Sequence, residues 1–266
     1  MLTIALLQAV GVVDAVADNL EKLEMYARRA AAGGADLLVT PELFPTGYAP
    51  AVVVDSDGEA VRAELSRIAR DQRIAVVGSS VERAGSTRHI TASFFDDQGT
   101  ERTRYRKAHL FGPDEKSVFR PGDDLPELIP YLDLTVALGL CYDIEFPEYA
   151  RSATQRGADL LCIPTAVPAT GDVGGAGAEL TYNAERISTL MVPTRALENG
   201  VYVAYANHTA PEFTGLSSIA SPYGTFLAKA GADEELLTAH VDEAEVRRAR
   251  EVNTYLTCAR PELYRL

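Results

Sequence analysis

Residues 30–42, AAAGGADLLVTPE, recur in a related form at residues 153–165, ATQRGADLLCIPT. Each copy reads as a helix, a turn around Gly-Ala-Asp-Leu-Leu and a buried strand. The chain therefore has two similar halves, and each half offers helices that must cover one face of a sheet. Two such sheets packed on their other faces form a four-layer αββα sandwich. The repeat thus predicts an α/β fold with two stacked sheets.

The rest of the chain alternates short apolar runs with amphipathic stretches, which is typical of strands that alternate with helices. The segment HITASFFDDQGTERTRYRK differs, because two extended runs flank the turn-forming cluster DDQGT and predict a hairpin. The sheets are therefore expected to be mixed. Further strands are predicted at LTVALGL, DLLCIP, VYVAYANH and LSSIASPYG, with helices near residues 147–156 and 187–199.

Composition and charge limit the classes of partner. The 266 residues are 47% hydrophobic and 24% charged, which is typical of a globular protein, and we expect a single domain over residues 1–266. The formal net charge of -13 argues against nucleic acid or an anionic membrane surface as a partner. Small molecules and other proteins remain as partners.

The N-terminus and the cysteines indicate the compartment. MLTIALLQAV lacks a basic segment and reads as a strand, not a signal peptide, and no apolar run approaches the ~20 residues of a membrane span. The three cysteines form no C-x-x-C pair, which makes a structural disulfide or a zinc site unexpected. These features predict a cytoplasmic protein that binds no metal.

Cys141 ends the apolar run LTVALGL and precedes EFPEYARSAT, in which Pro147 suits a first helical turn and Glu148 favours the helix dipole. A thiol in such a nucleophile elbow would have backbone N–H groups nearby to stabilise its thiolate and a substrate oxyanion. The alternatives are that Cys141 is a buried residue that only packs in the core, or an exposed thiol without a role. Cys162 lies inside DLLCIP and is expected in the core, whereas Cys258 lies in a polar tail.

A catalytic thiol needs a base. None of the four histidines, His89, His109, His208 and His240, stands in a recognisable pattern with an Asn or Asp partner. Glu42 follows an apolar strand and Pro41, at the strand end where α/β sheets place ligand sites, and burial could raise its pKa. Lys107 also stands at a strand end. A solvated or capping glutamate and a lysine that only reaches to solvent are the alternatives.

The segments TPELFPTGY (40–48), YRKAHLFG (105–112) and GLCYDIEFPE (139–148) together resemble the three signature segments of the nitrilase superfamily, the carbon-nitrogen hydrolases, in order and spacing. The similarity continues through RALENGVYVAYANH, SSIASPYGT and RPELY. The resemblance implies an αββα fold and a cofactor-free triad of Glu42, Lys107 and Cys141. It also matches Glu115 to a second glutamate of the family, and implies a homodimer that can assemble further.

The expected chemistry follows from these roles. Glu42 would take the thiol proton, and Cys141 would attack an amide carbonyl. Lys107 and the backbone N–H of Tyr142 would hold the oxyanion. Glu42 would then protonate the departing ammonia and activate the water that hydrolyses the thioester. Glu115 would orient Lys107 and the amide nitrogen.

The segment CYDIEFPE resembles the aliphatic amidase and omega-amidase branches more than the true nitrilases, so a small carboxamide is the expected substrate. A nitrilase or an N-carbamoyl amide hydrolase on the same scaffold is the main alternative. A non-catalytic binding relative is a third reading, which the complete triad disfavours.

Two further segments carry expectations. The Gly-rich stretch 165–186 is too long for an ordinary loop and is expected to shape the acyl pocket, with a surface insertion as the alternative. The tail at residues 252–266 is expected to pack at an oligomer interface. The candidate substrate contacts are Phe44, Tyr48, Tyr182, Asn183 and Arg186.

Overall fold

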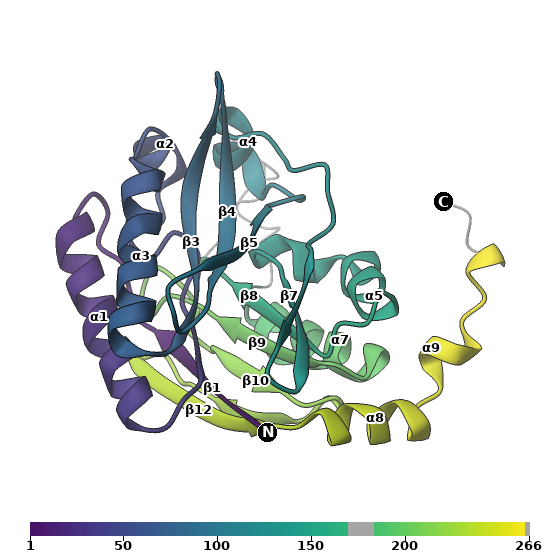
Figure 1. Cartoon of the computed structure of the whole chain (residues 1–266). Helices are drawn as coiled ribbons and strands as arrows, with labels where there is room; N and C mark the ends of the chain where they lie inside the picture. The colour runs from purple at the N-terminus through teal and green to yellow at the C-terminus, as the bar shows by residue number, and fades with distance from the viewer. Residues whose placement is uncertain (170–183, 264–266) are drawn as a thin grey trace.

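The computed structural model describes residues 1–169 and 184–263. Two six-stranded sheets form its centre (Figure 1). The first sheet has the strand order β12 (Glu235–Val241), β1 (Leu2–Gln8), β2 (Leu37–Val39), β3 (Ala75–Ala84), β4 (Thr87–Phe95) and β5 (Glu101–Arg106). The second has the order β11 (Phe226–Lys229), β10 (Ser218–Ala220), β9 (Tyr202–Ala206), β8 (Leu160–Pro164), β7 (Leu134–Leu138) and β6 (Leu128–Tyr131).

Both sheets are mixed, as predicted. In each, three parallel strands occupy the centre, β1, β2 and β3 in the first and β7, β8 and β9 in the second, and antiparallel strands flank them. The predicted hairpin is β4–β5. Its turn is closed by the Asp96 carboxylate, which accepts hydrogen bonds from the backbone N–H groups of Gln98 and Thr100. Gly99 supplies the positive φ of +80° that the turn requires.

Helices cover the outer face of each sheet, which completes the four layers. Helices α1 (Val16–Ala32) and α3 (Gly58–Gln72) lie side by side on the first sheet (Figure 1), and their apolar stripes pack on Ala5, Leu7 and Val76. Helices α5 (Pro147–Gln155) and α7 (Val192–Asn199) cover the second sheet. The remaining helical segments are α2 (Pro50–Val53), α4 (Gly112–Val118), η1 (Cys141–Glu145), α6 (Ala184–Arg186), η2 (Ile187–Met191), α8 (Glu243–Val252), α9 (Tyr255–Cys258) and η3 (Pro261–Leu263).

The repeated sequence has the same structural role in both halves. The Asp36 side chain accepts a hydrogen bond of 2.8 Å from the backbone N–H of Thr3, and the Asp159 side chain accepts one of 3.1 Å from that of Thr135. Each aspartate therefore joins the turn after an outer helix to the preceding parallel strand. Leu37 and Leu160 then begin the buried strands β2 and β8.

The main core lies between the two sheets. Ile4, Leu6 and Val39 of the first sheet share one buried cluster with Leu161 and Val203 of the second. Strand β2 contacts β8 and β9 across this interface. Cys162 is fully buried in the same cluster, as predicted. The carboxyl ends of the central strands of both sheets consequently meet at one edge of the sandwich, where the site is built.

The predicted helices are confirmed with one difference. Pro147 begins α5 at the predicted position. The predicted helix at 187–199 starts as the π-helical turn η2 and becomes α-helical only from Val192 to Asn199, where Gly200 ends it with a φ of +56°. In the two described stretches of chain, the helices are too short or too polar to cross a membrane. The cytoplasmic location stays a prediction.

Candidate active site

Glu42, Lys107 and Cys141 follow three different strands and meet between the two sheets. Glu42 comes three residues after β2, Lys107 directly follows β5, and Cys141 comes three residues after β7. Their exposed fractions are only 0%, 1% and 4%. The backbone N–H of Glu42 donates to the carbonyl of Thr165 beyond β8, over 3.1 Å. Residues far apart in the sequence are thus joined at one edge of the sandwich.

The Lys107 ammonium lies between two buried carboxylates. Its Nζ donates to Oε1 of Glu42 at 2.8 Å and to Oε1 of Glu115, in α4, at 2.7 Å. The hydroxyl of Tyr48 and the backbone N–H of Phe111 donate to the same Glu115 carboxylate at 2.6 and 2.8 Å. Glu115 is therefore held by three donors, and it holds the lysine in turn.

The charged groups in this cluster shift one another's pKa values. Burial raises the pKa of Glu42 to about 7, because desolvation and the charge of Glu115 outweigh the opposing effect of Lys107. Burial alone would lower the pKa of Lys107, but the two carboxylates raise it well above its ordinary value, so the lysine stays charged. Within the described chain, Oε2 of Glu42 is buried without a hydrogen-bond partner. Glu42 thus has a free acceptor atom and the pKa of a base that works near neutral pH.

The backbone at Cys141 forms a sharp elbow. Its φ of +44° lies in the left-handed region, which costs a residue with a side chain about 1–3 kcal/mol. The following residues form the 3-10 turn η1, and α5 begins only at Pro147. Strain of this kind at a strand end is typical of a nucleophile elbow, which presents the reactive atom above the sheet.

The surroundings of Cys141 favour the protonated form of its thiol. Burial raises the pKa of the Cys141 thiol, the Glu42 carboxylate raises it further, and Lys107 opposes this only in part. The thiol is buried, and α5 starts at Pro147, as predicted, six residues after the cysteine. Cys141 therefore rests as a thiol and needs a base for each reaction.

Asp143 organises the elbow, a role that the sequence reasoning missed. It is fully buried, and one carboxylate oxygen accepts from the backbone N–H of Leu140 (3.0 Å) and the hydroxyl of Tyr105 (3.1 Å). The other accepts from the backbone N–H of His109 (3.0 Å) and pairs with its Nδ1 (2.7 Å). The carboxylate thereby ties the nucleophile elbow to the segment that carries Lys107. The sequence does contain a sign of this role, because Asp143 is an acidic residue inside the largely apolar stretch GLCYDI.

Arg195 of α7 supports the same elbow from the other side. Its Nε donates to the carbonyl of Ile144 at 3.0 Å and its Nη2 to that of Glu145 at 2.8 Å. The guanidinium is nearly buried, so these bonds fix the end of η1 against the outer helix. Sequence gave no sign of this, because Arg195 stands in an ordinary helical stretch.

The candidate substrate contacts divide into four groups. Tyr48 reaches the site through Glu115, and its ring packs edge-on against Phe213. Phe44 does not fit its predicted role, because it is fully buried in the cluster between the first sheet and its helices. Arg186 is exposed in α6. Tyr182 and Asn183 lie outside the described residues.

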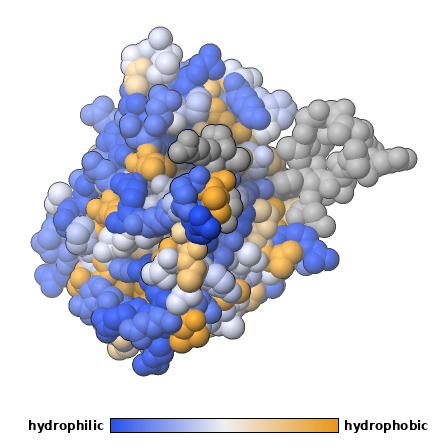
Figure 2. All heavy atoms as spheres, turned by 90° about the vertical axis from the view of Figure 1, so that its right-hand side faces the viewer, coloured by the Kyte–Doolittle hydropathy of each residue, from blue (hydrophilic) through white to orange (hydrophobic). Residues whose placement is uncertain are grey.

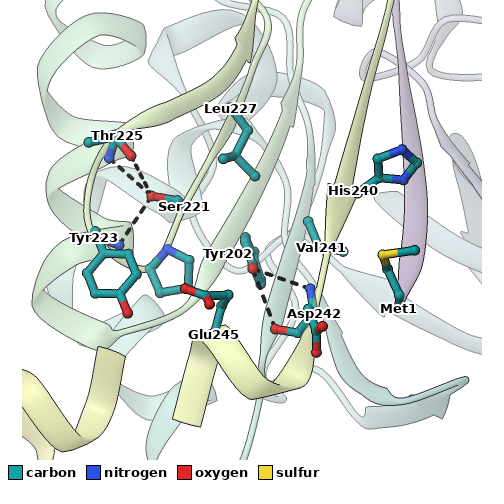
Figure 3. Close-up of a pocket in the computed structure, with 11 residues that line it drawn as sticks. Met1, Tyr202, Ser221, Tyr223, Thr225, Leu227, His240, Val241, Asp242 and Glu245 are labelled. Atoms are coloured by element: carbon teal, nitrogen blue, oxygen red, sulfur yellow. Dashed lines mark hydrogen bonds between the residues drawn. The ribbon is translucent and has the colours of Figure 1, made fainter. Parts of the chain in front are cut away.

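A separate hollow of about 310 Å³ lies away from this site (Figure 3). Tyr202, whose hydroxyl bonds to the backbone of Asp242, lines it at the amino end of β9, opposite the strand ends that carry the triad. Its polar groups do not converge on one point. Across residues 1–169 and 184–263, no group of three or more His, Cys, Asp or Glu could hold a metal ion.

Comparison with known proteins agrees with this arrangement. Residues 3–251 match the sequence model of the carbon-nitrogen hydrolases. The chain belongs to this family. It is 33% identical over 267 residues to mouse omega-amidase NIT2, covering 93% of this chain and 91% of that protein. It is 32% identical over 257 residues to 2-oxoglutaramate amidase of Bacillus subtilis, covering 93% of each.

Solved structures place the carbon-nitrogen hydrolase described here in the amidase branch of the nitrilase superfamily. An amidase from Nesterenkonia sp. AN1 superposes with a TM-score of 0.87 and 35% identity, covering 99% of this chain and 98% of that one. A mutant of that amidase, with a TM-score of 0.86 and 35% identity over 98% of this chain and 95% of that one, shows covalent addition of the acetamide moiety of fluoroacetamide at its active site cysteine. The protein is therefore a hydrolase of amide bonds, and Cys141 is its catalytic cysteine.

The role of Asp143 leads to a stability prediction. Asp143→Asn keeps the shape, but its amide turns an NH₂ group toward donors that need an acceptor. We expect the free energy of unfolding to fall by about 1–3 kcal/mol, the cost of buried unpaired donors. Chemical denaturation would measure this. Asp133→Asn, at a side chain that is 69% exposed, should change stability by no more than about 0.5 kcal/mol. Equal effects of the two variants would contradict the role.

Proposed function

We propose that the protein hydrolyses a small carboxamide to a carboxylate and ammonia, through a thioester on Cys141, with Glu42, Lys107 and Cys141 as its triad. The observation that carries this proposal is the buried Lys107 ammonium between two carboxylates, beside a glutamate whose pKa is raised to about 7. Such a cluster supplies a base and an electrophilic stabiliser within reach of one nucleophile.

In the first half of the proposed reaction, the Glu42 carboxylate takes the proton from the Cys141 thiol. The sulfur attacks the amide carbon, and the carbonyl electron pair moves to oxygen. Lys107 and the backbone N–H of Tyr142 stabilise this oxyanion. Because the pKa of the thiol is raised, proton transfer and attack are coupled, and no thiolate accumulates before substrate binds.

In the second half, protonated Glu42 gives its proton to the amide nitrogen. The oxyanion collapses, the C–N bond breaks, and ammonia leaves the thioester behind. A water molecule then loses a proton to Glu42 and attacks the thioester carbon. The C–S bond breaks and the sulfur regains the proton from Glu42, which leaves a carboxylic acid that ionises in water. One carboxylate thus serves both halves.

Glu115 is proposed to keep Lys107 charged and in place throughout this cycle. Its bond to Lys107 persists while Glu42 alternates between its protonated and ionised forms. Tyr48, which donates to Glu115 at 2.6 Å, places a half-buried aromatic ring at the same carboxylate. We propose that this ring contacts the substrate.

The relatives support an amide as the substrate, since they include an omega-amidase and a 2-oxoglutaramate amidase. The expectation that segment 165–186 shapes the acyl pocket falls mostly on residues 170–183, which lie outside the described residues. We propose that Arg186 pairs with an acyl carboxylate. A panel of neutral and acidic amides, nitriles and N-carbamoyl amino acids, with ammonia as the readout, tests the substrate class. Turnover of nitriles or ureido acids in place of amides would overturn the proposal.

The nucleophile is tested by substitution. Cys141→Ala removes the attacking sulfur and should lower kcat for amides by about 10⁶-fold, the scale for a lost triad nucleophile. The change removes little volume, so unfolding should shift by about 1 kcal/mol or less. Cys258→Ser, at an exposed cysteine, should keep full activity. Retained turnover in Cys141→Ala would contradict the mechanism.

The base is tested by the pH dependence of kcat/KM. Because the raised pKa of Glu42 leaves its carboxylate protonated below about pH 7, kcat/KM should fall about tenfold per pH unit below that point. Glu42→Gln should lower kcat by about 10²–10⁴-fold and abolish this acid limb. Glu59→Gln, an exposed glutamate of α3, should retain the profile. An unchanged limb in Glu42→Gln would assign the titration to another group.

We also propose a homodimer that can assemble further, with the C-terminal tail at the interface. The tail after α8 extends away from the body of the molecule (Figure 1), and residues from the end of α8 onward expose Val252, Tyr255 and Leu263. A groove of about 540 Å³ lies between the tail and α5. Apolar residues are scattered among hydrophilic ones on the face seen in Figure 2. Arg151, which lines the groove, has a buried Nη1 without a partner in the described residues.

Light scattering across a range of concentrations tests this assembly. The protein should have at least twice the mass of one chain at micromolar concentration. Tyr255→Ala should raise the dissociation constant about tenfold or more, as expected for an aromatic anchor. Leu132→Ala, at an exposed leucine between β6 and β7, should leave it unchanged. A monomer at micromolar protein would contradict the proposal.

A further inference from the structure

The proposed base and the nucleophile belong to different sheets, so their relative position depends on contacts between those sheets. Glu42 follows β2 of the first sheet, whereas Cys141 follows β7 of the second. Both peptide groups of Glu42 are bonded to the second sheet. Its N–H donates to the carbonyl of Thr165 at 3.1 Å, and its own carbonyl accepts from Nε2 of His208 at 2.7 Å.

His208 stands two residues after β9 and is fully buried. Its Nδ1 accepts from the backbone N–H of Gly11 at 3.4 Å, which leaves Nε2 as the protonated nitrogen that donates to Glu42. Burial lowers the pKa of His208 to about 4, so the ring stays neutral at the pH where Glu42 titrates. Both ring nitrogens are engaged, which excludes His208 as a base for the thiol.

The imidazole is also fixed on its faces. Its ring stacks on Phe213 at 4.6 Å between centroids and on Phe44 at 6.2 Å. A side chain at Gly11 has no room, because its Cβ would lie 2.2 Å from the Phe44 carbonyl. The donor Nε2–H is thus held in one orientation by packing from both sheets.

We propose that His208 is a positioning residue that sets the Glu42 carboxylate against Cys141 through the Glu42 backbone. With the Thr165 bond, it fixes the peptide groups on both sides of the Glu42 Cα, which leaves only the side-chain torsions free. Lys107 then fixes the carboxylate itself through Oε1. The inference rests on the proposed function of Glu42 as the base.

Three variants at His208 distinguish the effect of its N–H donor from the effect of its ring. His208→Gln places an amide N–H near the position of Nε2, His208→Asn is one methylene shorter and falls short of the Glu42 carbonyl, and His208→Phe fills the ring space without a donor. Tyr202→Phe is the matched control, because it removes a hydrogen-bonding group from a buried ring at the other end of the same strand (Figure 3). Each variant is measured for kcat and KM with amides, for thermal unfolding, and for the rate of Cys141 alkylation by iodoacetamide.

We expect His208→Phe and His208→Asn to lower kcat about 10²-fold with KM little changed, the scale for a misplaced catalytic group. Alkylation of Cys141 should slow in the same two variants. His208→Gln should recover most of both rates, and Tyr202→Phe should match the wild type. If His208→Phe does not fold, the comparison of Gln with Asn, both neutral amides, decides the question.

Wild-type kcat and alkylation in His208→Phe or His208→Asn would overturn the inference. Equal impairment of the Gln and Asn variants would also overturn it, since the ring and not the donor would then matter. Absence of amide turnover in the wild-type protein would instead refute the proposed function. The alkylation rates would still report whether His208 positions the base.

Discussion

The Lys107 ammonium, bonded to two buried carboxylates, is the interaction on which the rest of the site depends. A buried ion pair is stable only where each charge is paired and hydrogen-bonded, and here one cation serves two anions. Glu115 is satisfied by further donors, whereas Oε2 of Glu42 has none among the described residues. The charge imbalance therefore falls on Glu42, whose pKa rises to about 7. This imbalance makes the glutamate suitable as a base.

The stacking of two sheets is what brings this cluster to the thiol. Each sheet alone carries only part of the chemistry, because the carboxylate and the ammonium come from one and the cysteine from the other. Polar bonds across the interface fix the parts. Asp143 joins the elbow to the segment after β5, and Thr165 and His208 bond to the backbone of Glu42. Burial of these bonds makes them costly to break, so the geometry is rigid before substrate arrives.

Burial also favours the protonated form of the Cys141 thiol. A cysteine before Pro147 and Glu148 reads as a thiol at a helix start, where the dipole would lower its pKa. In the fold, desolvation and the nearby Glu42 carboxylate outweigh such effects and raise it. The proposed mechanism is consistent with this shift, because a protonated thiol beside a carboxylate of pKa about 7 requires proton transfer during attack.

Sequence alone determined the two halves, the mixed sheets, the positions of most strands and helices, and the three residues at strand ends. These follow from local patterns: the repeated Gly-Ala-Asp-Leu-Leu, the DDQGT turn, and Glu42, Lys107 and Cys141 within their motifs. The tertiary structure decided what local patterns do not encode. It placed Phe44 in the core, gave Asp143, Arg195 and His208 their partners, and set the pKa directions. Those properties depend on desolvation and on contacts between segments up to 197 residues apart, which exist only when both sheets are packed.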